Sequence, residues 1–219
     1  EAQNRRARCV NLDPAAEHFA YPVSADIRDL VHLDDVMEQM ELGPNGALVF
    51  AMEHLVENIE WLREELLQNG DDEYFLLDCP GQIELYSHVP AMRAVASELQ
   101  RMGFKLCAVY LLDAQFAADA SKFISGVLSC LSAMTSMELP HVNVLSKCDL
   151  LGERERRRLD GFLDVDAGAV RQLLDADTSP AFFRLNSAVC GLLEEWSLVQ
   201  FLQLDVDDEA SIDEIVAQV

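Results

Sequence analysis

Short runs of apolar residues alternate along the chain with longer segments in which apolar residues recur every three or four positions. The short runs have the length and composition of buried strands. They cover residues 9–12, 74–77, 106–112, 142–145 and 199–204. Strands that alternate with helices predict an α/β fold, a mainly parallel sheet flanked by helices that binds its ligand at the carboxyl ends of the strands.

Two segments show the helical period most clearly. In residues 47–68, apolar side chains recur at alternating steps of four and three, at Leu48, Met52, Leu55, Ile59, Leu62 and Leu66. Such a stripe is either a core seam or a dimer seam, and we favour the core. Residues 120–137 mix large apolar residues with small ones such as Gly126, which predicts a crossover helix packed closely on the sheet.

Composition limits the classes of protein that fit. Half of the 219 residues are hydrophobic and no Gly/Ser-rich or Pro-rich linker divides them, so a single domain over residues 1–219 is expected. The 39 acidic and 16 basic residues give a net charge of −23, which repels phosphate backbones and anionic lipids. We therefore expect no direct nucleic-acid binding and no membrane binding. The main basic cluster, residues 154–158, is expected to be a solvated helix face.

The six cysteines are far apart in sequence, so neither a zinc knuckle nor a disulfide framework fits their spacing. A reducing compartment is the natural setting. No apolar stretch reaches the length of a membrane span, and the first residues lack the hydrophobic core of a signal peptide. These features predict a cytoplasmic protein.

Two motifs that follow predicted strands point to nucleotide chemistry. Asp78-Cys79-Pro80-Gly81-Gln82 follows the run at 74–77. The Asp78 carboxylate suits the water shell of Mg²⁺, and the Gly81 N–H suits a γ-phosphate. Ser146-Lys147-Cys148-Asp149 follows the run at 142–145. Asp149 can accept two hydrogen bonds from guanine, which adenine cannot offer, while the Lys147 stem lies along the purine. Together the motifs predict a GTPase.

Further carboxylates are placed for the same chemistry. Asp13 ends the first predicted strand, at the rim expected for Asp78, and can orient a water molecule or accept its proton. A turn-initiating Asp-Pro is the alternative. Asp26 follows an aromatic, loop-like stretch of the kind that orders around a γ-phosphate, and it can reach Mg²⁺ through water. A helix-start aspartate with a neighbouring arginine is its simpler explanation.

A tight turn at Gly43-Pro44-Asn45 precedes the long helical segment. Asn45 carries both a donor and an acceptor on a short stem, so its amide can be aimed with little loss of entropy. By itself this tripeptide is a helix-entry turn. Its place between the switch-like stretch and Asp78 gives it a functional interpretation.

Taken in order, these motifs resemble those of the GPN-loop GTPases. The resemblance covers the chain from about Glu1 to its end, through Leu12-Asp13-Pro14-Ala15, Asp26-Ile27-Arg28-Asp29, Gly43-Pro44-Asn45-Gly46, Asp78 to Leu85 and Ser146 to Leu150. It implies a P-loop NTPase-like fold of the SIMIBI type, with GTP as substrate and Mg²⁺ as cofactor.

The resemblance also implies a role for each residue. Asp13 and Gln82 position the attacking water, and Asp78 and Asp26 hold the hydrated Mg²⁺. Gly81, Ser146, Lys147, Cys148 and Asp149 bind GTP. Gly43, Pro44 and Asn45 reach into the site of a partner subunit, in a homodimer or in a heterodimer with another GPN-loop paralogue. The family is linked to assembly and nuclear import of RNA polymerase II, which implies polymerase subunits or assembly factors as partners and shuttling to the nucleus.

One expected element is missing from the sequence. No Gly-x-x-x-x-Gly-Lys-[Ser/Thr] phosphate loop occurs in the 219 residues, although the family places a strand and that loop before the position of Glu1. The expectation is a truncated GTPase that, as given, binds GTP poorly. The alternative is a non-catalytic pseudo-GTPase adaptor that dimerises through residues 47–68 and binds clients. An ATPase of the same sheet type is disfavoured by Asp149.

Overall fold

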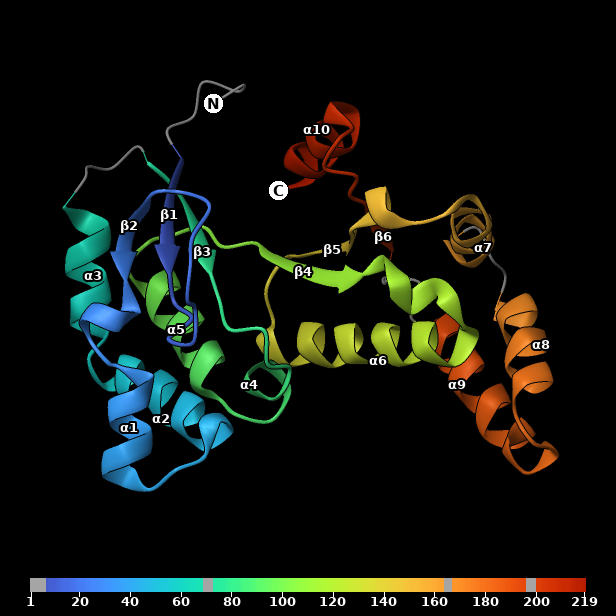
Figure 1. Cartoon of the computed structure of the whole chain (residues 1–219), viewed down its shortest axis with the longest axis horizontal. Coiled ribbons are helices and arrows are strands. Elements are labelled where there is room, and N and C mark those ends of the chain that lie inside the picture. Colours follow the sequence, from blue (N-terminus) through green and yellow to red (C-terminus); the bar gives the residue numbers. More distant parts are fainter. Residues whose placement is uncertain (1–6, 69–72, 164–166, 196–199) are drawn as a thin grey trace. The chain divides into compact units, whose positions relative to one another are not determined.

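The computed structural model describes residues 7–68, 73–163, 167–195 and 200–219. The chain divides into two compact units, residues 1–106 and 107–219, each of which is described by itself. Each unit contains a three-stranded parallel sheet with helices around it (Figure 1). The expected α/β architecture with parallel strands and flanking helices is confirmed. The single-domain organisation stays a prediction.

The first unit is built on strands β1 (Ala7–Asn11), β2 (Val23–Asp26) and β3 (Tyr74–Asp78). Their order in the sheet is β2-β1-β3, with both neighbours parallel to β1. Asn11 is in register with Asp26 on one side and with Asp78 on the other. The sheet therefore brings the carboxyl ends of all three strands to one edge.

Strand β2 and the division of the long helix differ from expectation. The stretch before Asp26 was expected to be a loop, yet its last residues pair with β1 as β2. The helical segment at 47–68 forms two helices, α2 (Pro44–Glu57) and α3 (Ile59–Leu67). They separate at Asn58, whose side chain donates to the carbonyl of His54 at 2.9 Å and competes with the helical backbone pattern.

The stripe on these two helices belongs to the core. Leu48, Met52, Leu55, Leu62 and Leu66 are all buried, which confirms the core interpretation. Three more helices complete the unit: α1 (Leu33–Met40), α4 (Glu84–Ser87) and α5 (Ala91–Arg101). A 3₁₀ turn, η1 (Ile27–Asp29), follows β2 directly.

The second unit contains β4 (Ala108–Asp113), β5 (His141–Ser146) and β6 (Phe201–Gln203) in the order β4-β5-β6. All are parallel, and Asp113 lies opposite Ser146. Short 3₁₀ turns η2 (Ala114–Ala118), η3 (Cys148–Leu150) and η4 (Pro180–Phe182) connect longer elements. The remaining helices are α7 (Glu153–Leu163), α8 (Ala167–Asp177), α9 (Phe183–Glu195) and α10 (Glu209–Gln218).

The crossover helix expected at residues 120–137 is present as α6 (Ala120–Met137), which runs alongside β4 in Figure 1. Phe123, Ile124 and Val127 on α6 are buried in a core cluster with Leu112 of β4. A Cβ added to Gly126 would lie 2.7 Å from the Leu112 Cδ2 atom. The small residue therefore permits the close helix–sheet contact that the sequence predicted.

One surface expectation is also confirmed. Residues 154–157 are exposed on α7, as expected for a solvated basic face. The acidic stretch near the end begins helix α10, where the Asp208 carboxylate caps the helix by accepting the Ala210 N–H at 3.1 Å. Across the part of the chain that the structure describes, no helix has the length and apolar character needed to cross a membrane.

Candidate functional site

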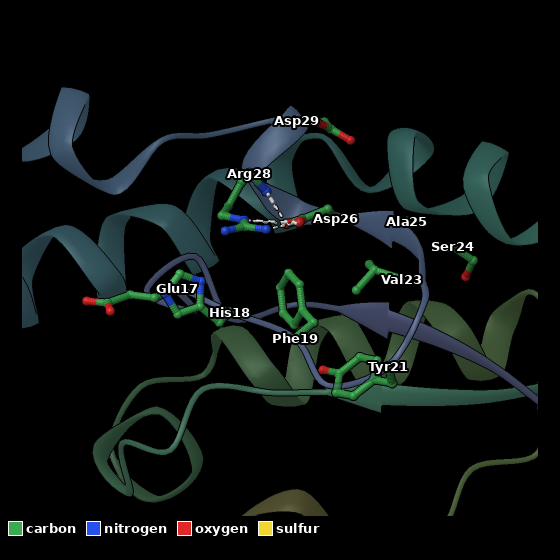
Figure 2. A pocket seen from close by; sticks show the side chains of 10 residues that line it. All are labelled: Glu17, His18, Phe19, Tyr21, Val23, Ser24, Ala25, Asp26, Arg28 and Asp29. Atoms are coloured by element: carbon green, nitrogen blue, oxygen red, sulfur yellow. Dashed lines mark hydrogen bonds and ion pairs between the residues drawn. The ribbon is translucent and has the colours of Figure 1, made fainter.

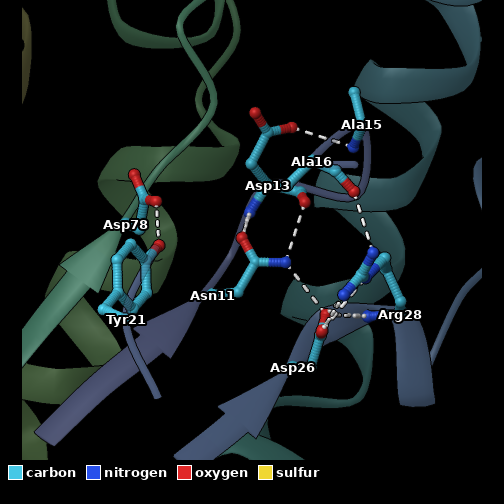
Figure 3. A network of polar contacts seen from close by, with 8 residues as sticks. All are labelled: Asn11, Asp13, Ala15, Ala16, Tyr21, Asp26, Arg28 and Asp78. Atoms are coloured by element: carbon cyan, nitrogen blue, oxygen red, sulfur yellow. Dashed lines mark hydrogen bonds and ion pairs between the residues drawn. The ribbon is translucent and has the colours of Figure 1, made fainter. Parts of the chain in front are cut away.

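Asn11 organises the carboxyl edge of the first sheet. Its side chain is fully buried, donates to the Asp26 carboxylate at 2.9 Å and to the Asp13 carbonyl at 3.0 Å, and accepts from the Asp13 N–H at 2.9 Å (Figure 3). One amide thus connects the ends of β1 and β2 and sets the course of the backbone at Asp13. Asp13 and Asp78 lie along the same edge, as expected, and Asp26 ends the neighbouring strand β2 at this edge as well.

Asp13 is half-buried directly after β1, and one oxygen of its carboxylate accepts the Ala15 N–H at 2.9 Å. This bond forms the Asx turn that the Asp-Pro dipeptide predicted. The turn leaves the second carboxylate oxygen of Asp13 available. The turn and the catalytic interpretation are therefore compatible.

Asp26 is tightly paired with Arg28. The carboxylate caps η1 by accepting the Arg28 N–H at 3.0 Å, and it also accepts from the guanidinium at 2.6 and 3.0 Å. Partial burial opposes ionisation of Asp26, but the hydrogen bonds from Arg28 and Asn11 outweigh it and lower the pKa of this carboxyl. The helix-start arrangement is thus present. A role of Asp26 toward Mg²⁺ stays a prediction.

Asp78 is exposed at the end of β3, where one of its oxygens accepts a hydrogen bond from the Tyr21 hydroxyl (Figure 3). Desolvation, together with this bond, raises the pKa of Tyr21 to about 12. Tyr21 belongs to the stretch expected to act as a switch. This stretch therefore contacts the predicted magnesium ligand directly.

A hydrogen bond from Tyr86 holds the loop after Asp78. The Tyr86 hydroxyl donates to the Pro80 carbonyl, and burial, with nearby negative charge, raises the pKa of Tyr86. Desolvation, together with the charges of Asp78 and Asp13, raises the pKa of the Cys79 thiol to about 12, so it is a neutral thiol. Gly81 is exposed, and nothing lies within 4 Å of where its Cβ would be. The space above Gly81 is open to a ligand.

The Gly43-Pro44-Asn45 turn forms the start of α2. Gly43 is the N-cap and Pro44 occupies the first helical position, where its missing N–H costs nothing. The Asn45 Oδ1 atom accepts a hydrogen bond from Gln82 Nε2 at 2.7 Å. Two residues predicted to be catalytic, 37 positions apart, therefore meet in the same chain.

A pocket of about 570 Å³ lies beside this edge. Phe19 and Tyr21 pack at 5.5 Å between ring centroids, and the Arg28 guanidinium stands 4.7 Å above the Phe19 ring (Figure 2). Of the predicted site residues, only Asp26 is in its lining. The pocket is thus lined by the switch-like stretch and lies beside the sheet edge that is predicted to bind the phosphates.

In the second unit, the predicted guanine motif, residues 146–149, begins at the last residue of β5. Lys147 has left-handed backbone angles, φ 62° and ψ 33°, which are uncommon for a residue with a side chain. The Ser146 hydroxyl donates to the Leu112 carbonyl on β4 at 3.3 Å. The Lys147 ammonium contacts an Asp113 oxygen at 2.7 Å. The hydrogen bond from Lys147, against some desolvation, lowers the pKa of Asp113.

Cys148 and Asp149 form the turn η3 beside the loop after β6. The Cys148 N–H donates to the Leu204 carbonyl at 3.1 Å, and Cys148 itself is buried. Asp149 is half-buried, and within the described residues its carboxylate has no hydrogen-bond or ion-pair partner. Leu204 and Asp205 thus lie beside residues 146–149.

The residues fit a hydrated Mg²⁺ better than a metal held by protein alone. No group of three or more His, Cys, Asp or Glu side chains within the described ranges is arranged to bind a metal ion. Mg²⁺ usually keeps several waters and binds one or two carboxylates together with substrate phosphates. Asp78, which is exposed and has an oxygen free of Tyr21, suits that arrangement.

Sequence reasoning gave no role to Asn11, Tyr21 or Asp113. Asn11 and Asp113 carried a usable signal, because each is a polar residue that ends an apolar strand. Asp113 ends β4 as Asp78 ends β3. Tyr21 had no comparable signal, since its contact with Asp78 spans 57 positions.

Comparison with known proteins places the chain in a family. It is 47% identical to GPN-loop GTPase 3 of Dictyostelium discoideum over all of this chain and 77% of that protein. It is 49% identical to GPN-loop GTPase 3 of Saccharomyces cerevisiae over 98% of this chain and 80% of that protein. The chain belongs to the GPN-loop GTPase family. This confirms the resemblance carried by the five motifs.

Two further comparisons agree on the extent of the similarity. The family model described as "Conserved hypothetical ATP binding protein" matches residues 1–219 of this GPN-loop GTPase family member. The crystal structure of PAB0955, a GTPase in apo form from Pyrococcus abyssi, superimposes with a TM-score of 0.81 at 23% identity, over 99% of this chain and 86% of that one. The latter shows that the two proteins share a fold.

Proposed function

We propose that this protein binds GTP and hydrolyses it to GDP and phosphate. The observation that carries the proposal is the meeting of predicted catalytic groups in the first unit, where Asp13 and Asp78 share one sheet edge and Gln82 contacts Asn45 at 2.7 Å. Membership in the GPN-loop GTPase family supports the same activity.

Each group has a definite task in this proposal. The free oxygen of Asp13 orients the attacking water and accepts its proton. Gln82 orients that water through its Oε1 atom, which the contact with Asn45 leaves unused in the single chain. Asp78 and Asp26 would hold a hydrated Mg²⁺, and the bound ion would neutralise charge on the phosphates. Lys147 lies along the purine and Asp149 accepts from guanine.

The proposal extends to assembly and location. We infer that the protein acts as a homodimer or as a heterodimer with another GPN-loop paralogue, in which Asn45 exchanges its contact with Gln82 of its own chain for the partner's phosphates. Family resemblance supports a cytoplasmic protein that shuttles to the nucleus and assists assembly and import of RNA polymerase II. Light scattering with and without GTP tests the dimer, and the location of polymerase subunits after depletion of the protein tests the import role.

Base choice gives the sharpest test of the activity. Binding and Mg²⁺-dependent hydrolysis of GTP and ATP are measured for the native protein and for Asp149→Asn. The variant loses the double acceptor, so its preference for GTP over ATP is expected to fall by at least about tenfold. Asp177→Asn, an exposed carboxylate on α8, is the matched control. An unchanged preference for GTP over ATP in Asp149→Asn refutes the base assignment. If the wild type neither binds nor hydrolyses GTP, the non-catalytic adaptor is favoured.

A further inference from the structure

Asp113 holds the ammonium of the guanine-motif lysine across two neighbouring strands. Asp113 ends β4 and lies in register with Ser146, the residue before Lys147. Its Oδ2 atom is 2.7 Å from Lys147 Nζ, and its Oδ1 atom accepts the Gln115 N–H at 2.9 Å. Both oxygens of this carboxylate are therefore engaged, one by the backbone of its own turn and one by Lys147.

We propose that Asp113 is the positioning residue for Lys147 in nucleotide binding. It fixes the outer end of the lysine stem, so that the stem lies ready along the carboxyl edge of β5 for the purine ring. The inference rests on the proposed GTP binding and adds to it a residue outside the guanine motif itself.

The physical reason lies in the freedom of a lysine side chain. A lysine has a flexible four-carbon stem, and ordering it on ligand binding costs conformational entropy. Lys147 begins from a defined left-handed backbone and ends at Asp113, so both ends of the stem are held before a ligand arrives. The lysine side chain is 56% exposed but that of Asp113 only 27%, so the anchor is less exposed to solvent than the group it holds.

The role of Asp113 in capping η2 does not by itself explain its ion pair with Lys147. The cap uses Oδ1 and the Gln115 N–H, whereas Lys147 contacts the other oxygen. Asp119 offers a close comparison, because it caps α6 by accepting the Lys122 N–H at 2.7 Å and pairs with Lys122 Nζ at 3.4 Å. Asp119 therefore has the same local chemistry, but its lysine is not in the guanine motif.

A double-mutant cycle tests the proposal. The affinity of the native protein for GTP in Mg²⁺ is measured by calorimetry for the wild type, Asp113→Asn, Lys147→Met and the double variant, with Asp119→Asn as control. Asp113→Asn is expected to weaken GTP binding about three- to fivefold, the scale of a partly exposed ion pair. In the Lys147→Met background the same change is expected to have no effect, and Asp119→Asn is expected to bind like the wild type.

The outcomes separate the two claims. If the wild type binds GTP and Asp113→Asn binds it equally or more tightly, the positioning role is wrong while GTP binding stands. An equal loss in the Lys147→Met background also overturns it, because the effect then does not pass through Lys147. If the wild type binds no GTP, the proposed function fails first. Should Asp113→Asn not fold, Asp113→Glu keeps the charge and is expected to retain most of the affinity.

Discussion

At the scale of single residues, contacts between a polar side chain and a carboxylate define the carboxyl edges of both sheets. Asn11 connects to Asp26, Tyr21 to Asp78, and Lys147 to Asp113. Each contact holds a carboxylate in one orientation, which lowers the cost of ordering the site when a ligand binds. Residues outside the recognised motifs therefore decide how the motif residues are presented.

His141 at the start of β5 predicts a pH dependence of stability. Among the described residues, neither ring nitrogen has a hydrogen-bond partner, and burial lowers the pKa of His141. The unfolded chain therefore binds a proton at this site more readily, and stability falls as pH drops below about 6.5, the ordinary histidine value. Urea unfolding at pH 7.5 and 5.5 measures the loss.

The matched variants isolate this one histidine. His141→Phe fills the same space beside Tyr110 and is expected to lose less stability between the two pH values than the wild type. Replacing the exposed His32 by Gln is expected to leave the pH dependence unchanged. An equal pH dependence in wild type and His141→Phe would contradict the assignment.

At the scale of elements, local sequence signals set where helices and strands lie, and close packing sets how they fit. Asn58 divides a continuous apolar stripe into α2 and α3, yet both halves bury their apolar side chains. Helix α6 follows its predicted bounds and lies against β4 through Gly126.

Gly126→Ala is predicted to destabilise the protein, although alanine is the better helix former. The new methyl would meet Leu112 at 2.7 Å in a buried cluster, and overpacking of a core costs about 1–3 kcal/mol. This exceeds the gain in helix propensity of about 1 kcal/mol. Gly191→Ala on α9, where nothing lies within 4 Å, is the control and is expected to be neutral or stabilising. The melting temperatures of both variants test this prediction. A higher melting temperature for Gly126→Ala would contradict it and would show that the Leu112 side chain moves aside at little cost.

At the scale of the whole molecule, charge is the dominant property. With a net charge of −23, acidic groups repel one another in the compact state more than in the expanded chain. The exposed ion pairs, such as Arg63 with Glu60, contribute little by comparison.

Added salt is therefore expected to stabilise the native protein. Raising NaCl from about 20 to 300 mM shortens the Debye length to below about 10 Å and screens the repulsion. The melting temperature is expected to rise by a few degrees, measured by calorimetry at pH 7.5. A melting temperature that falls with salt would mean that attractive ion pairs outweigh the repulsion.

The sequence by itself determined the alternating strands and helices, the parallel sheets, the family and the motif residues that follow β1, β3 and β5. These features depend on local periodicity and on short ordered motifs, which are present in the chain before it folds. The strand β2 escaped notice because four residues, Val23–Asp26, carry too little periodic pattern.

Only the tertiary structure decided which side chains meet at the sheet edges. The contacts of Asn11 with Asp26, Gln82 with Asn45 and Lys147 with Asp113 join residues 15, 37 and 34 positions apart. The contacts of Asn11 and Lys147 follow from strand order and register, which bring one residue of each parallel strand to the same edge. The contact of Gln82 with Asn45 instead joins the loop after β3 to the start of α2. Periodicity along one segment carries no information about its neighbour in the sheet, so these partners become visible only when the strands are paired.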